Sequence, residues 1–215
     1  MSPVSETPAI VDPNEGLTWT NLRDHLVRKY SLPENARLLG RQTPEEKAQR
    51  ETVNVLRAFV GFPKPETISE GMTLLRVTSF RDPYERRNEP GGSWWFPESL
   101  LLGILSQYEG ELRPHPPHLD AVRNKLQSLL ALSDNFSDVE QLWCTRLAAG
   151  VKLTGLAGPA SPQPVDSSLA GSYLSIGSLP GLAWQYYFPN MPAVRLEKYP
   201  LPLLEGTWLR NKRPR

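Results

Sequence analysis

Arg76, Trp94, Trp95 and Glu197 are the residues whose types and settings favour ligand chemistry. Arg76 interrupts the apolar run "LLRV". An arginine there is costly to bury unless its planar guanidinium meets an anion such as a carboxylate or pyrophosphate. The neighbouring tryptophans could form a flat wall for a planar cationic ring. Glu197 stands late in the chain, between apolar residues. Together these residues suit a dinucleotide with a positively charged ring.

Short strands are the elements expected to carry these residues. Residues 74–78 form a compact apolar run after a glycine, and "SWWF" at 93–96 forms a second one. The runs "LAWQYYF" (182–188) and "AVRLEKY" (193–199) are separated by a proline-containing turn. We therefore expect Arg76, the tryptophans and Glu197 to lie on three different strands.

Helical signals occur both before and between these strands. The clearest helix is expected in the segment 43–61, where Thr43 and Glu46 form a capping box, Pro44 occupies the first turn and Gly61 marks the end. A second capping box, Ser137 and Glu140, predicts a helix that carries Cys144. That helix is predicted over residues 138–150. The remaining helices are predicted over residues 20–30, 97–110 and 118–132.

The order of these elements predicts an α+β protein, with a small helical N-terminal part followed by a mixed, strand-rich core with helices. Four segments are expected: a flexible leader at 1–16, a helical segment at 17–70, an α+β core at 71–209 and a basic tail at 210–215. Residues 151–181 are rich in Gly, Ser and Pro, and we expect a long functional, disordered or covering loop there.

Composition limits the classes of partner and compartment. The net charge is +1, so no overall field would attract nucleic acid or a membrane, and the tail "RNKRPR" is expected to be a frayed terminus. Cys144 is the only cysteine, which excludes a disulfide within the chain. The first residues lack a secretory pattern, and no apolar stretch approaches ~20 residues. We expect a soluble protein, either cytoplasmic or delivered by a signal-independent secretion route, with no membrane partner.

Metal binding is not expected. His115 and His118 have H-x-x-H spacing, with Asp120 nearby. Prolines on both sides favour a solvated loop over the rigid elements that converge metal ligands.

The strand with Arg76, the strand "GSWWF", the helix "PESLLLGILSQY" and the late glutamate resemble the ADP-ribosyltransferase fold of bacterial toxin and effector domains. The resemblance covers residues 72–108 and 182–205. It implies a transferase or glycohydrolase that consumes NAD as its substrate, with a protein, a nucleic acid or water as acceptor. A regulatory protein partner is also expected.

The resemblance implies individual roles. Arg76 would hold the pyrophosphate or ribose of NAD, and Ser93, Trp94 and Trp95 would support the nicotinamide pocket, with Gln185 a further candidate for it. Glu197 would stabilise the oxocarbenium ion as the C–N bond breaks. The strand keeps one serine of the family's Ser-Thr-Ser pattern, and Arg195 stands where the family has a second Glu or Gln.

A noncatalytic interpretation is also open. The run from Trp94 to Phe96 could alternate between two faces of a strand and fill a core, Arg76 could pair with Glu85 or Glu98, and Glu197 could be exposed. The protein would then be an adaptor, inhibitor or immunity-type partner, with "QYYFPNMP" as its surface aromatic patch. The two interpretations differ in whether Arg76, Trp94 and Glu197 converge on one cleft.

Overall fold

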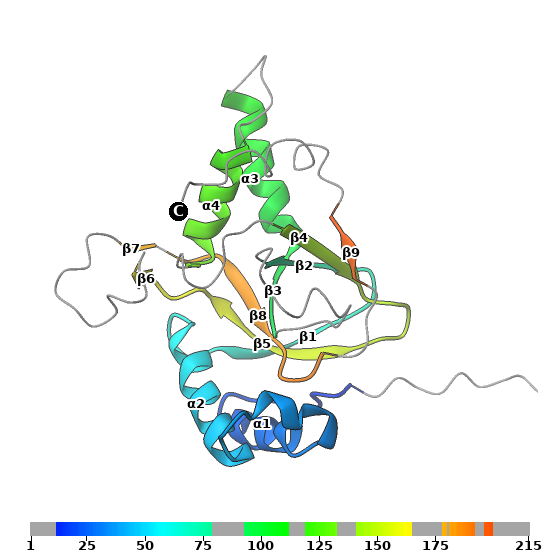
Figure 1. The fold of residues 1–215 in the computed structure, drawn as a ribbon. Coiled ribbons are helices and arrows are strands. Elements are labelled where there is room, and N and C mark those ends of the chain that lie inside the picture. Colours follow the sequence, from blue (N-terminus) through cyan, green and yellow to red (C-terminus); the bar gives the residue numbers. More distant parts are fainter. Residues whose placement is uncertain are drawn as a thin grey trace, which may run out of the picture.

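The computed structural model describes residues 12–78, 93–111, 119–132, 141–164, 178–179, 181–191 and 196–199. Within these ranges the chain forms a seven-stranded antiparallel sheet with helices packed on it (Figure 1). The strand order is β1-β5-β8-β3-β2-β4-β9, so many neighbours in the sheet are distant in sequence. The predicted α+β class is confirmed.

The sheet contains β1 (Lys64–Ile68), β2 (Thr73–Thr78), β3 (Trp94–Pro97), β4 (Gln141–Arg146), β5 (Leu153–Pro159), β8 (Trp184–Tyr187) and β9 (Glu197–Lys198). A separate pair joins β6 (Gln163–Pro164) to β7 (Ser178–Leu179). The predicted strands around Arg76, around Trp94 and in "LAWQYYF" are confirmed. The late strand at Glu197 is present, with two residues.

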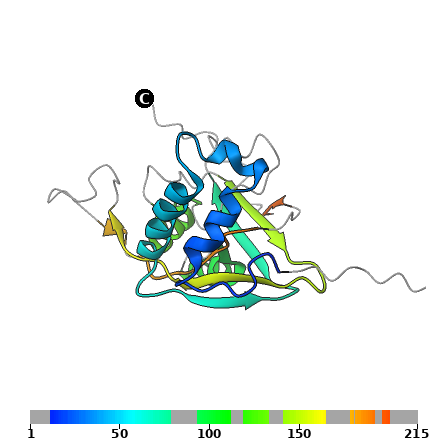
Figure 2. The ribbon, with the colours of Figure 1, turned by 90° about the horizontal axis from the view of Figure 1, so that it is seen from below.

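Two pairs of helices pack on the same face of the sheet. The helices are α1 (Leu22–Tyr30), the 3-10 helix η1 (Pro33–Leu38), α2 (Pro44–Arg57), α3 (Glu98–Glu111) and α4 (Leu119–Leu129). Apolar residues of α3 and α4 pack against Leu75 and Phe96, whereas those of α1 and α2 pack against Leu156 and Tyr187. Figure 1 shows the two helix pairs at opposite ends of the molecule, and Figure 2 shows α1 and α2 side by side.

The other face of the sheet forms a third apolar cluster, around Leu74, Trp95 and Leu153. Tyr186 and Phe188 stack within it, with ring centroids 5.8 Å apart. Direct cross-strand partners share a face and successive residues alternate, so each strand contributes to both sides. Both faces of the sheet are therefore used for packing.

Helix α2 follows its local signals. The Thr43 side chain accepts a hydrogen bond from the Glu46 amide, and the Glu46 carboxylate accepts one from the Thr43 amide. Gly61 follows the helix with φ 73°, a left-handed conformation that suits glycine. The predicted capping box is confirmed, whereas the predicted stop at Gly61 is wrong, because the helix ends at Arg57 with Ala58 as its C-cap.

The predicted helix at 138–150 is wrong, because residues 141–146 form β4 and pair with all six residues of β2. Leu142 and Thr145 are buried on opposite faces of the sheet. Pairing satisfies the backbone groups of β2, which would otherwise be left at an edge, and this gain overrides the weak helical pattern. The Ser137–Glu140 capping box lies outside the described residues.

The expectation of a loop throughout 151–181 is also wrong, because Leu153–Pro159 forms β5 between β1 and β8. Its small residues meet a packing requirement. A methyl group on Gly155 would overlap the Phe188 ring, and one on Gly158 would lie 3.1 Å from Phe59. Glycine here permits close approach of aromatic rings.

The N-terminal segments also differ from expectation. The segment 17–70 contains β1 as well as helices. Residues 12–16 of the expected flexible leader are anchored: Asn14 is fully buried and donates to the Asn190 carbonyl at 2.8 Å, and Asp12 accepts from the Thr154 amide at 2.9 Å. Residues 1–11 and the basic tail lie outside the described residues. None of the described helices has the length and apolar character needed to cross a membrane.

Candidate functional site

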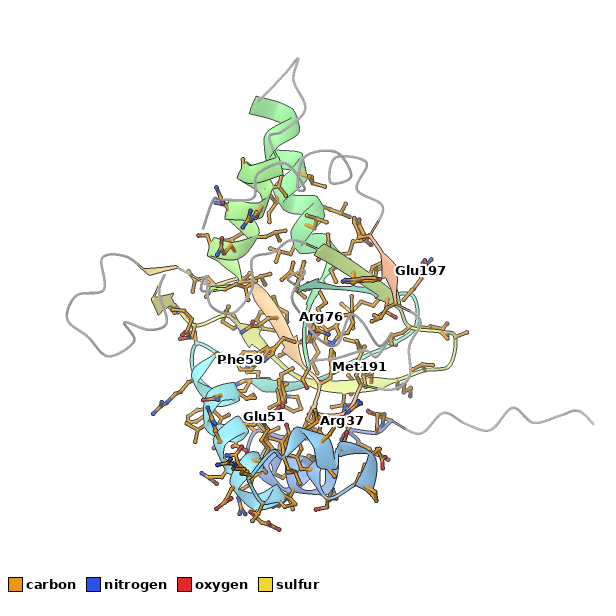
Figure 3. The ribbon with its side chains drawn as sticks, in the orientation of Figure 1. Arg37, Glu51, Phe59, Arg76, Met191 and Glu197 are labelled. Atoms are coloured by element: carbon orange, nitrogen blue, oxygen red, sulfur yellow. The ribbon has the colours of Figure 1, made fainter. Side chains whose placement is uncertain are left out.

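Arg76 and Glu197 do not converge. Arg76 is opposite Trp143 on β4, whereas Glu197 is opposite the next residue, Cys144. Because successive residues of β4 point to opposite faces, Arg76 and Glu197 project to opposite sides of the sheet. Figure 3 shows Arg76 in the interior of the sheet and Glu197 at its edge on β9. The expected joint site of these two residues is therefore not formed.

Glu197 belongs to the side of the sheet that α3 covers, and its side chain is exposed. Burial raises the pKa of the Cys144 thiol, and the nearby carboxylates of Glu197 and Glu98 raise it further. Glu98 accepts a hydrogen bond of 2.6 Å from the Tyr199 hydroxyl. A raised thiol pKa opposes formation of a nucleophilic thiolate at Cys144.

The aromatic strand fills core on both faces. Trp95 is 1% exposed in the cluster with Leu74 and Leu153, so its ring has no open side for a ligand. Trp94 is half-buried on the opposite face, with ring centroids 5.4 Å from Phe59 and 5.0 Å from Tyr187. The alternation considered from sequence is confirmed, and the two tryptophans do not form a common wall.

Gln185 and Ser93 make contacts that position the helices. The Gln185 amide donates to the Ala58 carbonyl at 2.8 Å, which ties the end of α2 to β8. Ser93 is 8% exposed, and its hydroxyl accepts from Lys29 Nζ at 3.4 Å. Neither side chain lies next to Arg76 and Glu197 at the same time, because those two residues project to opposite faces of the sheet.

A polar group that we call the Glu51 cluster joins α1 and α2 to the sheet: Lys29, Tyr30, Glu51, Ser93 and Tyr187. The Glu51 carboxylate accepts hydrogen bonds from both tyrosine hydroxyls, and the Tyr187 hydroxyl is also hydrogen-bonded to Ser93. Burial lowers the pKa of Lys29, an effect that the Glu51 carboxylate opposes. Burial and the Glu51 charge raise the pKa of Tyr187 well above its usual range.

The chemistry of the Glu51 cluster is that of a buried, mutually satisfied network. A lysine beside a serine can in principle deprotonate it, but Ser93 is almost enclosed and Glu51 favours the charged form of Lys29. Such a network fixes the position of a helix pair. We therefore assign the cluster to the docking of α1 and α2.

The surface aromatic patch expected at "QYYFPNMP" is wrong, because all five residues from Gln185 to Pro189 are buried. Strand β8 lies between β5 and β3, and its aromatic side chains enter the clusters on both faces. A run of aromatic residues is buried here because its strand is central in the sheet.

Exposed apolar side chains gather instead where the chain leaves α2. Seven large apolar side chains of the described part are exposed, and five of them belong to this region: Trp19, Val60, Phe62, Leu182 and Trp184. We call these five the α2 exit patch. Phe62 is 69% exposed and stacks on Trp19, with centroids 4.4 Å apart. The other two, Leu32 and Leu102, lie elsewhere on the fold.

Backbone contacts connect the members of the patch. The Val60 amide donates to the Pro159 carbonyl at 2.9 Å, and Pro159 is the direct partner of Trp184. The Leu182 amide donates to the Ala160 carbonyl at 2.8 Å, and the flanking residues 181 and 183 donate to carbonyls at the end of α4. The main chain beneath the patch is therefore fixed on several sides.

Leu182 has φ 73°, which is unusual for a residue with a branched side chain. It is also 64% exposed, so packing of its own side chain does not account for the strained conformation. Strained backbone of this kind concentrates at binding sites. Sequence reasoning missed this region, although the apolar residues directly after Gly61 and Gly181 were a usable signal.

The described residues contain no group of three His, Cys, Asp or Glu side chains that could hold a metal ion. His115 and His118 lie outside the described ranges. Comparison with known proteins gives no match: no family model, no curated protein and no solved structure is similar to this chain.

Proposed function

We propose that this protein is a noncatalytic protein-binding domain, an adaptor or inhibitor, whose contact surface is the α2 exit patch. One observation carries the proposal: five large apolar side chains, three of them aromatic, are exposed on segments that backbone hydrogen bonds, strand pairing and one ring stack connect. Aromatic residues dominate the binding energy of protein interfaces, and grouped exposed apolar residues are characteristic of interaction sites.

The geometry of the predicted catalytic residues favours binding over a NAD-consuming reaction. Cleavage of NAD by the expected route needs Arg76 and Glu197 at the same ligand, and they project to opposite faces. A direct check is incubation of the purified protein with NAD. Nicotinamide release that is lost in Arg76→Ala would favour ADP-ribosyl transfer or NAD hydrolysis over the binding function.

The proposal is tested by selecting binders from a phage-displayed library of random 16-residue peptides, with the full chain as target. The test variant is Phe62→Ser with Trp184→Ser. Truncating central aromatic residues of an interface typically costs about 2 kcal/mol or more each, so binding of selected peptides should fall beyond detection.

The matched control is Leu32→Ser with Leu102→Ser, which removes two equally exposed apolar side chains outside the patch. It should bind the selected peptides as the unmodified protein does. Both double variants should melt within a few degrees of the unmodified protein. Equal binding by the test and control variants would refute the proposal.

A further inference from the structure

Two exposed basic side chains flank Val60 and Phe62 of the α2 exit patch along the chain, whereas the Glu66 carboxylate lies near Trp184 through the hydroxyl of Tyr186. Arg57 is exposed in the last turn of α2, three residues before Val60, and Lys64 is exposed at the start of β1, two residues after Phe62. The segments 17–20, 57–64, 157–163 and 181–185 carry the patch residues, and they contain no Asp or Glu. This local excess contrasts with a chain that has 24 basic and 23 acidic residues in total.

Arg57 and Lys64 have no ion-pair partner among the residues that the structure describes. Within the described part of the chain, no internal ion pair competes with a partner for these two cations. Exposed carboxylates of a ligand would meet them without first breaking internal pairs, and complementary charge raises both specificity and association rate.

We infer that the partner is an acidic, amphipathic polypeptide segment, with aromatic or branched apolar side chains that cover the α2 exit patch and carboxylates that reach Arg57 and Lys64. This inference rests on the proposed binding function and names the chemistry of its partner. The fixed main chain around Leu182 favours such a segment, because little of the receptor must become ordered on binding.

An acidic polypeptide fits these observations better than a nucleic acid. Nucleic-acid binding draws most of its affinity from several phosphate contacts, typically 6–10 basic contacts in strong binders. The patch has two exposed cations beside it, and the chain has a net charge of only +1. Its apolar side chains supply the larger share of the contact surface.

The test uses peptides selected as above and the charge-reversal variant Arg57→Glu with Lys64→Glu. The selected peptides should be enriched in Asp and Glu, and the variant should raise their dissociation constant about 3- to 30-fold, as expected for two exposed ion pairs. The effect should shrink at high salt. Arg57→Gln with Lys64→Gln should raise the dissociation constant by a smaller factor. This neutral variant replaces the charge-reversal variant in the test if charge reversal at the helix end impairs folding.

The control is Arg146→Glu with Lys152→Glu, which makes the same change in net charge at exposed positions on β4 and just before β5. It should leave the dissociation constant within about twofold of the unmodified protein, because exposed charges more than ~10 Å apart are screened. An equal effect of both charge variants would overturn the inference.

The remaining outcomes separate the two proposals. Patch-dependent peptides without an acidic bias would overturn the acidic partner and leave the binding function standing. An absence of any patch-dependent peptide would refute both. Patch-dependent binding of a labelled 12-nucleotide oligothymidine, or a patch-dependent dimer in sedimentation equilibrium, would replace the acidic segment with a nucleic acid or with a second copy of this chain.

Discussion

Leu182 offers the sharpest test of the geometry of the patch. Its φ of 73° lies in the left-handed region, which costs a residue with a Cβ about 1–2 kcal/mol. Glycine does not pay this steric cost, whereas alanine does. We therefore compare Leu182→Gly with Leu182→Ala, since both remove the same exposed side chain and differ in what the backbone allows.

The expected magnitude follows from two opposing terms. Relief of the left-handed conformation favours glycine by about 1–2 kcal/mol. The greater freedom of glycine in the unfolded chain costs about 0.5–1 kcal/mol. Leu182→Gly should therefore be more stable than Leu182→Ala by up to about 1.5 kcal/mol, although glycine normally destabilises relative to alanine.

The control pair is Leu102→Gly and Leu102→Ala. Leu102 is 51% exposed in the interior of α3, where glycine should be less stable than alanine by about 1 kcal/mol. The sign of the difference should thus reverse between the two positions. Urea unfolding measures it as a change in midpoint at constant slope.

The reasoning is refuted if glycine is less stable than alanine at position 182 by as much as at position 102. The same variants separate stability from binding. Both Leu182 variants lose a patch side chain, so both should weaken the selected peptides to a similar extent, even though their free energies of unfolding differ.

Three further predictions concern the packing of the sheet and helices. Burial lowers the pKa of His25 below its unfolded value of 6.5, and the Arg28 charge lowers it further. The folded protein should therefore lose stability as the pH falls below about 6.5. Melting temperatures at pH 7.5 and pH 5.0 should differ less in His25→Gln than in the unmodified protein. Gly155→Ala should cost about 1–3 kcal/mol of unfolding free energy, and combining it with Phe188→Leu should cost less than the sum of the single changes in urea unfolding. Tyr187→Phe removes a hydrogen bond to a carboxylate and should cost about 1.5–3 kcal/mol; a loss below about 0.5 kcal/mol would contradict the proposed docking role of the Glu51 cluster.

Several elements follow from the sequence because their causes are local. The capping box of Thr43 and Glu46 involves residues within one turn of helix, and the left-handed φ of Gly61 reflects its own backbone freedom. The apolar runs of β2, β3 and β8 are short, bounded by turn residues and rich in aromatic or branched side chains. Signals of this range do not depend on which other segments lie nearby.

Elements that depend on contacts with segments far along the chain were predicted less well. Strand β4 exists because β2 offers it an edge, and nothing within 138–150 identifies that edge. Gly155 and Gly158 resemble loop residues until Phe188 and Phe59 are placed beside them. In both cases a partner far along the chain determines the local structure.

The candidate site shows the same division. The sequence by itself determined that Arg76 and the two tryptophans lie on short strands, and it left two interpretations of these residues open. Only the tertiary structure decided between core and cleft, because a shift of one residue in the pairing of β4 with β9 would move Glu197 to the face of Arg76. The α2 exit patch likewise depends on tertiary packing, since exposure of Phe62 and burial of Tyr187 depend on which elements cover each ring and not on residue type.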